Sequence, residues 1–157
     1  MKLYVTGHDA SGKAIFSHAG PPPREIRPGS YDLWTTCGPI VVPDDADPAA
    51  PASVATFPSP GETAFRIYSV PPPQDRPQEI TSPAEGFEAE DPEMHTSDTL
   101  DYVIILGGQA DLELDDGRKE RVVTGDCIVQ RGTRHAWRVV GDEPLILCAI
   151  LLGAQRA

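Results

Sequence analysis

The stretch that decides the fold runs from Met94 to Gly108, MHTSDTLDYVIILGG. A second, complementary stretch runs from Gly125 to Trp137, GDCIVQRGTRHAW. In the first stretch, residues of odd number share one face of an extended backbone, and that face begins polar and ends apolar. It carries His95, Ser97, Thr99, Asp101, Val103 and Ile105. In the second stretch, the same alternation places Trp137 and Val139 on the side of His135. Two histidines and a carboxylate therefore converge above an apolar floor if both stretches belong to one barrel.

Short strands surround these two stretches at regular intervals. The expected strands are Asp101–Leu106, Gln109–Leu114, Arg121–Val123, Cys127–Arg131, His135–Val140 and Leu145–Leu152. Turn signals separate them at Asp115-Asp116-Gly117, Gly125-Asp126 and Gly141-Asp142. This rhythm predicts an all-β chain with a closed or sandwiched antiparallel architecture, without a helix of three turns and without an internal repeat.

The first part of the chain differs in composition, because sixteen of the seventeen prolines precede His95. Proline confines strands to edges and boundaries, so short extended pieces are expected there. They are a hairpin of Lys2–Thr6 with Lys13–His18, a proline-rich crossing at Pro21–Pro28, strands at Tyr31–Cys37 and Thr63–Val70, and an exposed arm at Asp44–Pro60. We divide the chain into residues 1–62, a hairpin and arm packing on the barrel, and residues 63–157, the barrel.

Size and charge limit the partners. At 157 residues the chain fits one domain with a sizeable core. Its formal net charge of −11 argues against a phosphate-binding surface, so no nucleic acid is expected. Nothing reads as a membrane span or a signal peptide, which predicts a cytoplasmic protein with no membrane partner.

Two further features of composition are local. The three cysteines, Cys37, Cys127 and Cys148, are an odd number at unrelated spacings, which indicates buried free thiols in a reducing compartment. The stretch from Gln74 to Met94 holds seven acidic residues against the single Arg76. It is interpreted as a solvated acidic loop, with a docking surface for a basic partner as the alternative.

At the two defining stretches the chain resembles the cupin family, whose members fold as a double-stranded β-helix, a small jelly-roll barrel. The family's first motif, G-x5-H-x-H-x(3,4)-E-x6-G, corresponds here to His95-x-Ser97-x3-Asp101-x6-Gly108. Its second motif ends in P-x-G-x2-H-x3-N, which corresponds to Gln130, Gly132, His135 and Val139. The resemblance spans about residues 63 to 152 and implies a cupin barrel carrying the N-terminal β-hairpin and the proline-rich arm.

Three departures from the family pattern matter. Ser97 stands in place of the second histidine, Asp101 in place of glutamate and Gln130 in place of proline. The ligand set that the resemblance implies is thereby reduced to His95, Asp101 and His135. Two imidazoles and one carboxylate are the composition of facial-triad sites that leave positions open for substrate or dioxygen. The implied cofactor is a divalent transition metal, Fe2+, Mn2+, Ni2+ or Zn2+, without a choice among them.

Each candidate residue also has a plainer interpretation. His95 and His135 are otherwise hydrogen-bonded histidines inside the barrel. Asp101 is either a ligand or, being shorter than glutamate, a group that orients His95 or acts as a general base. Ser97 is a pocket hydroxyl that could position a metal-bound water, and it joins Asp101 as a candidate catalytic residue.

The candidate substrate-binding residues are Trp137, Val103, Ile105 and Gln130. The first three would supply a dry wall, although core packing is the default for Trp137, as it is for the other aromatic residue Tyr102. Gln130 either reaches into the pocket with its amide or belongs to a turn before Arg131-Gly132, and we favour the turn.

The segments H-x2-D-T-x-D-Y and Q-R-G-x2-H-x-W resemble a subgroup of small one-domain cupins, some of which accompany biosynthetic pathways and are described as oxidoreductases. The resemblance implies a metal-binding enzyme acting on a small oxygenated organic molecule, as an oxidoreductase or dioxygenase, or as a lyase or isomerase. The alternative is a non-catalytic cupin that binds a small molecule and has a degenerate metal site. Because cupins commonly dimerise, a homodimer is also expected, with the hairpin and arm of one subunit against the other.

Overall fold

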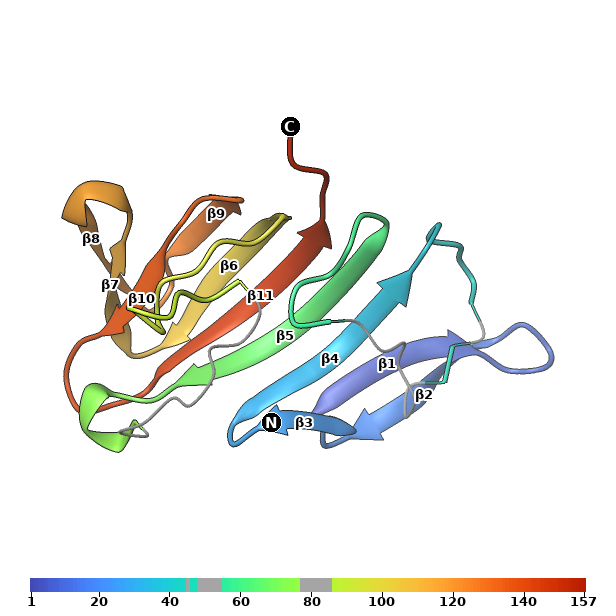
Figure 1. Ribbon diagram of the computed structural model, residues 1–157. Helices are drawn as coiled ribbons and strands as arrows, with labels where there is room; N and C mark the ends of the chain where they lie inside the picture. Colours follow the sequence, from blue (N-terminus) through green and yellow to red (C-terminus); the bar gives the residue numbers. More distant parts are fainter. Residues whose placement is uncertain (45, 48–54, 77–85) are drawn as a thin grey trace.

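The structure, a computed structural model, describes residues 1–44, 46–47, 55–76 and 86–157 (Figure 1). Its strands are β1 (Leu3–His8), β2 (Ala14–Gly20), β3 (Arg24–Arg27), β4 (Ser30–Cys37), β5 (Glu62–Val70), β6 (Thr99–Gly107), β7 (Gln109–Glu113), β8 (Lys119–Val123), β9 (Cys127–Arg131), β10 (Ala136–Val139) and β11 (Leu145–Gly153). Within the described residues, helical geometry is limited to the short 3-10 turns Pro73–Asp75 and Asp115–Gly117. The all-β class predicted from the strand rhythm is therefore confirmed.

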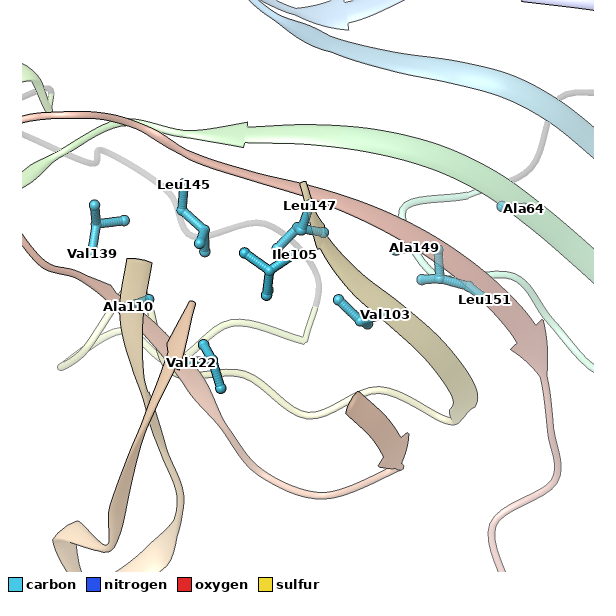
Figure 2. Close-up of a cluster of buried hydrophobic side chains, with 10 residues drawn as sticks. All are labelled: Ala64, Val103, Ile105, Ala110, Val122, Val139, Leu145, Leu147, Ala149 and Leu151. Carbon is cyan, nitrogen blue, oxygen red and sulfur yellow. The ribbon is translucent and has the colours of Figure 1, made fainter. Parts of the chain in front are cut away.

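Two antiparallel sheets enclose the core. A six-stranded sheet has the order β3-β4-β5-β11-β6-β9, and a three-stranded sheet has the order β10-β7-β8. Buried side chains from both sheets form one cluster between them, including Ile105 of β6, Leu145 of β11, Ala110 of β7, Val122 of β8 and Val139 of β10 (Figure 2). This double sheet closed around one core is the jelly-roll barrel that the resemblance implied.

Alternation along β6 shows why the sequence specifies which face is inside. Val103 and Ile105 are 4% and 1% exposed, whereas the intervening Tyr102 and Ile104 are 45% and 41% exposed. Side chains of successive strand residues point to opposite faces, so one parity meets the opposite sheet and the other meets solvent. Asp101 shares the inward parity of β6, which places a carboxyl group at the polar end of the barrel interior.

The N-terminal hairpin is confirmed as strands β1 and β2, which form a sheet of their own. Leu3 of the hairpin packs with Leu33 of β4 and Ile67 of β5 in a second, smaller hydrophobic cluster. The hairpin therefore lies against the six-stranded sheet. Strand β4 also pairs directly with β5 across the division we placed at residue 62, and that division stays a prediction.

Strand β3 was not expected, because its residues lie inside the proline-rich crossing at Pro21–Pro28. It pairs only with β4 and forms the edge of the six-stranded sheet. An edge strand tolerates flanking prolines because one of its sides makes no ladder hydrogen bonds. Proline density therefore indicates the position of a strand in the sheet and does not exclude the strand.

The acidic stretch before His95 is held to the barrel by ion pairs. Arg138 of β10 contacts Asp91 and Glu93, and Arg134 donates to Glu88 at 2.6 and 2.7 Å. These arginines hold the pKa of the Asp91 carboxyl below its usual value. The interpretation as a solvated loop is wrong for these residues. Of the expected arm at Asp44–Pro60, residues 45 and 48–54 lie outside the described residues, as do the acidic residues within 77–85.

Two composition-based expectations have different outcomes. All three cysteines are free, but Cys37 and Cys127 are exposed, so the expectation that they are buried is wrong for these two. Cys37 is the last residue of β4 and Cys127 is the first residue of β9, so both lie at strand ends. In the part of the chain that the structure describes, no helix is long and apolar enough to span a bilayer.

Candidate functional site

The two motif histidines lie side by side. His95 and His135 form an antiparallel bridge in which each backbone N–H donates to the other residue's carbonyl, at 3.0 and 2.9 Å. Their imidazole rings are 4.1 Å apart between centroids. Gly132 makes this approach possible, because its φ is 63° and a Cβ there would lie 3.2 Å from the carbonyl oxygen of Ser97. The convergence predicted for the two stretches is observed for both histidines.

Both imidazoles are fixed in the same tautomer. Nδ1 of His95 lies 3.1 Å from the carbonyl oxygen of Glu93, and Nδ1 of His135 lies 2.9 Å from that of Thr133. A carbonyl oxygen can only accept, so in each ring Nδ1 carries the hydrogen and Nε2 keeps its lone pair. The same arrangement orients imidazoles for metal binding in other proteins.

The environment also keeps both rings neutral. Burial lowers the pKa of His95 to about 4, and burial together with the neighbouring His95 lowers the pKa of His135 to about 4. At neutral pH both residues are uncharged, which is the form that binds metal ions. The lone pairs of both Nε2 atoms are therefore available without loss of a proton.

Aromatic side chains flank the histidine pair on both sides. Phe87 stacks on His95 with 4.4 Å between ring centroids, and Phe57 stacks on the same imidazole at 5.8 Å. On the other side, Trp137 meets His135 edge-on at 5.9 Å. Sequence analysis singled out Trp137 but missed Phe57 and Phe87, which lie in irregular segments where no periodicity marks them. An aromatic wall of this kind excludes water from the imidazole faces.

Phe57 reaches the site because a buried arginine fixes its segment. Arg66 of β5 is 3% exposed and pairs with Asp32, which it faces across β4 and β5. Its remaining donors reach the carbonyl oxygens of Ala55 at 3.0 Å and Thr56 at 2.5 Å, and the hydroxyl of Tyr68 at 3.1 Å. The residues immediately before Phe57 are thereby held to the sheet.

A second polar group lies on β6 and β9. Asp101 and Gln130 are directly opposite each other in the ladder, and both are buried. Burial raises the pKa of Asp101 to about 6, opposed by a hydrogen bond with Thr99. The hydroxyls of Ser97 and Thr99 are 2.8 Å apart, so a row of hydroxyls leads to the carboxyl group. The turn that we favoured for Gln130 is wrong, because Gln130 is a strand residue of β9.

The inward residues Val103 and Ile105 belong to the main hydrophobic cluster, against which Trp137 also packs. They follow Asp101 on the same face of β6. Core packing, the default expected for Trp137, is therefore observed for Val103 and Ile105 as well, and their role as a substrate wall stays a prediction.

The donor set fits a metal ion only in part. Two neighbouring neutral imidazoles suit a divalent transition metal. Among residues 1–44, 46–47, 55–76 and 86–157, however, no three or more histidine, cysteine, aspartate or glutamate side chains lie close enough to hold one ion together. The structure therefore groups His95 with His135 but not with Asp101, whose role as a third ligand stays a prediction.

The lowered pKa values of the two histidines predict acid sensitivity of the metal-free protein. A folded state that protonates near pH 4 binds fewer protons than an unfolded state that protonates near 6.5, so stability is lost as the pH falls from about 6.5 towards 4. Each histidine contributes at most about 3 kcal/mol. Asp101 opposes this trend, because its raised pKa lets the folded state gain a proton below about pH 6.

Urea denaturation of chelator-treated protein between pH 7.5 and 4 measures this loss. We expect His135→Gln to flatten the pH dependence, while His18→Gln in the hairpin leaves it unchanged. Equal slopes for wild type and His135→Gln would show that His135 is not kept neutral by burial.

Comparison with known proteins adds relatives in biosynthetic gene clusters. No family model matches the sequence. The chain is 32% identical over 146 residues to phomopsin biosynthesis cluster protein C' of Diaporthe leptostromiformis, covering 86% of this chain and 68% of that protein. It is 46% identical over 53 residues to the cupin-domain-containing oxidoreductase srdD of Neurospora crassa, covering 33% of this chain and 27% of the relative.

Solved structures of similar shape include two bacterial proteins. A double-stranded β-helix protein from Klebsiella pneumoniae superposes with a TM-score of 0.43 at 18% identity, over 60% of this chain and 70% of that one. A cupin 2 conserved barrel protein from Salinispora arenicola gives a TM-score of 0.37 at 21% identity, over 59% and 63% of the two chains.

The family assignment combines three observations. Two antiparallel sheets enclose one core, the histidines of the two motifs meet at one end of it, and the relationship to phomopsin biosynthesis cluster protein C' extends over most of both chains. The chain belongs to the family of the phomopsin cluster protein and is a cupin.

Proposed function

We propose that this cupin is a metal-dependent enzyme that acts on a small oxygenated organic molecule, as an oxidoreductase or as a lyase or isomerase. The observation that carries the proposal is the pair of neutral imidazoles of His95 and His135, with both Nδ1 atoms bonded to carbonyls and both Nε2 atoms left as donors of lone pairs. The name of the Neurospora relative, a cupin-domain-containing oxidoreductase, supports the same class.

In this proposal His95 and His135 hold a divalent transition metal through Nε2. The ion would supply Lewis acidity and, for a redox metal, electron transfer. Asp101 takes the second role that its sequence position suggested, a general base, because a carboxyl group with a pKa of about 6 can accept and return a proton near neutral pH. Ser97 connects to it through the hydroxyl of Thr99.

The aromatic residues define the environment of the reaction. Phe87 and Phe57 cover one side of His95, and Trp137 closes the other side of the pair. Exclusion of water from this space strengthens the electrostatic interactions between the protein and a bound molecule. The site therefore suits a small molecule with an apolar or aromatic body and a few oxygen atoms.

Catalysis is tested with metal-loaded and chelator-treated protein against a panel of phenols, enols, 2-hydroxy acids and 2-oxo acids. Product formation is followed by mass spectrometry and dioxygen uptake by an electrode. The proposal predicts conversion of at least one class that requires both the metal and Asp101, with Asp116→Asn in the exposed turn between β7 and β8 as the matched control. A metal-loaded protein that converts no member of the panel would count against an enzyme.

A second candidate function is a non-catalytic cupin that binds a small molecule. It is favoured by the donor geometry, because Asp101 is not grouped with the histidines in the described residues and Ser97 replaces a histidine. The same panel distinguishes the two functions. A binding protein would retain ligands in its metal-free form without converting them.

We also propose that the protein is a homodimer. On the outer face of the six-stranded sheet, Tyr102 lies between Ile150 and Val129 in the ladder, and all three are exposed. The hairpin presents a further exposed pair, Tyr4 against Phe16. A second copy of the chain offers a matching apolar surface for each of these patches, and large exposed apolar patches mark interfaces.

Substituting arginine for Tyr102 at the centre of the outer face is expected to convert the dimer to a monomer. A buried charge without a partner opposes association by several kcal/mol, which is enough to raise the dissociation constant more than a hundredfold. Val123→Arg, at an exposed apolar position of β8 in the other sheet, is the matched control. Light scattering behind size exclusion measures the mass, and a dimeric Tyr102→Arg protein would exclude this face.

A further inference from the structure

The pair formed by Asp101 and Gln130 is set apart by its unpartnered atoms. The two residues are registered opposite each other on β6 and β9, with exposures of 7% and 5%. Among the described residues, neither Asp101 Oδ1 nor Gln130 Nε2 has a hydrogen-bond partner, although both atoms are buried. A buried polar atom without a hydrogen-bond partner destabilises the folded state. Two unpartnered polar atoms on directly paired residues indicate that a bound group forms hydrogen bonds with both atoms.

The other atoms of the pair are already engaged. Thr133 donates its hydroxyl to Gln130 Oε1 at 3.3 Å, and Thr99 forms a hydrogen bond with Asp101. These bonds turn the amide oxygen away and leave the amide N–H groups and one carboxylate oxygen as the remaining functional groups. Side chains paired across an antiparallel ladder have Cβ atoms about 4.5–5.5 Å apart, so one bound atom can reach both.

The hydrogen-bonding roles of these two atoms determine which kind of group can bridge them. An ionised carboxylate only accepts hydrogen bonds, whereas an amide N–H only donates. A hydroxyl oxygen satisfies both, because it donates to Oδ1 and accepts from Nε2. A carboxylate ligand would meet the like charge of Asp101 in a chain of formal charge −11, and an ammonium group would leave the amide without an acceptor.

We propose that Asp101 and Gln130 together bind one hydroxyl group of a neutral small molecule. The inference rests on the proposed function in taking that molecule to be the substrate. Thr133 couples this subsite to the histidine pair, because its hydroxyl holds Gln130 and its carbonyl accepts from His135 Nδ1 at 2.9 Å. The hydroxyl is thereby fixed at a defined distance from the imidazoles.

A hollow lies beside the strand ends that carry the pair, although neither Asp101 nor Gln130 lines it. It has a volume of about 400 Å³ and reaches the two hydroxyl-bearing residues that lead to Asp101. Its lining includes Ser97, Thr99, Leu100, Arg131, Gly132 and Arg156. Residues of this lining precede Asp101 and follow Gln130 directly in the sequence.

The test compares phenol with toluene, which has a methyl group in place of the hydroxyl, by NMR titration of chelator-treated full-length protein. We expect wild type to bind phenol about tenfold more tightly than toluene, with shifts in the backbone amide signals of Asp101 and Gln130. In Gln130→Met, which keeps the side-chain length and removes the donor, this preference should disappear. Asp116→Asn, in the exposed turn between β7 and β8 and away from this hollow, should retain it.

Two results would overturn the inference. Equal affinities of wild type for phenol and toluene, or an undiminished phenol preference in Gln130→Met, would show that the pair holds a water molecule only. The melting temperature supplies an independent readout, because removal of an unpartnered buried amide should leave it unchanged or raise it. A marked decrease, or failure of Gln130→Met to fold, would show that the amide is satisfied within the protein and has no ligand to bind.

This experiment is independent of the metal proposal. It uses metal-free protein and requires no turnover. Loss of the phenol preference would leave metal binding by His95 and His135 intact, and absence of a metal would leave the preference measurable.

Discussion

Replacing Arg66 with alanine is expected to destabilise the protein by about 3 kcal/mol, a large part of the 5–15 kcal/mol typical of a domain. Arg66 is 3% exposed and pairs with Asp32, whose side chain is 4% exposed. Removal of one partner of a buried pair leaves the other charge uncompensated, which costs about 3–5 kcal/mol. The lower value applies here because Arg24 also contacts Asp32, at 2.6 Å.

The same substitution leaves three hydrogen-bond acceptors behind, on Ala55, Thr56 and Tyr68. The two carbonyls belong to the segment that precedes Phe57, so the stack of Phe57 on His95 should be weakened as well. We therefore expect the loss of stability to be accompanied by a change in the environment of His95, visible in its imidazole NMR signals.

Urea denaturation measures the free energy of unfolding in this experiment. Arg121→Ala is the matched control, because Arg121 forms a similar pair with Asp111 but its side chain is 46% exposed, and almost no loss of stability is expected. Replacing both partners, in Arg66→Met with Asp32→Leu, should recover much of the stability. A loss for Arg66→Ala no larger than that for Arg121→Ala would show that the buried pair does not stabilise the fold.

The fold could be predicted from local patterns because the strands of the barrel alternate strongly. Residues of one parity are buried in both β6 and β11. They are all apolar in β11, whereas in β6 the polar Thr99 and Asp101 precede Val103 and Ile105. Gly-containing turns separate the strands, so the inward face follows from the sequence. Strand β3 could not be predicted in this way. Its pairing with β4 at the sheet edge is decided by tertiary contacts, and its flanking prolines point locally to irregular structure.

The site could be predicted where it lies on strands and not where it lies on loops. Strand alternation predicted that His135 and Trp137 share one face, and the spacing of the two motifs predicted that His95 lies near His135. Phe57 and Phe87 could not be predicted as site residues. They lie in irregular segments that are held near the site by long-range hydrogen bonds, such as those of Arg66, and such bonds leave no periodic pattern in the sequence. Gln130 was misjudged because Arg131-Gly132 signals a turn, yet the turn begins only after β9 ends at Arg131.

The largest functional effect is expected from loss of either histidine. If His95 and His135 supply the protein's two Nε2 ligands, removal of one leaves a single imidazole, which should lower metal affinity by at least a hundredfold. Asp101→Asn tests the third predicted ligand in the same assay. A loss comparable to that of the histidine variants would assign Asp101 to the ion, and an unchanged affinity would leave it with the general-base and hydroxyl-binding roles.

Elemental analysis of protein purified without an affinity tag or chelator tests the central claim most directly. The account predicts about one transition metal ion per chain in wild type and in the hairpin variant His18→Ala, and no bound metal in folded His135→Ala. A wild-type protein that is purified without metal and also fails to bind added Fe2+, Mn2+, Ni2+ or Zn2+ would contradict it.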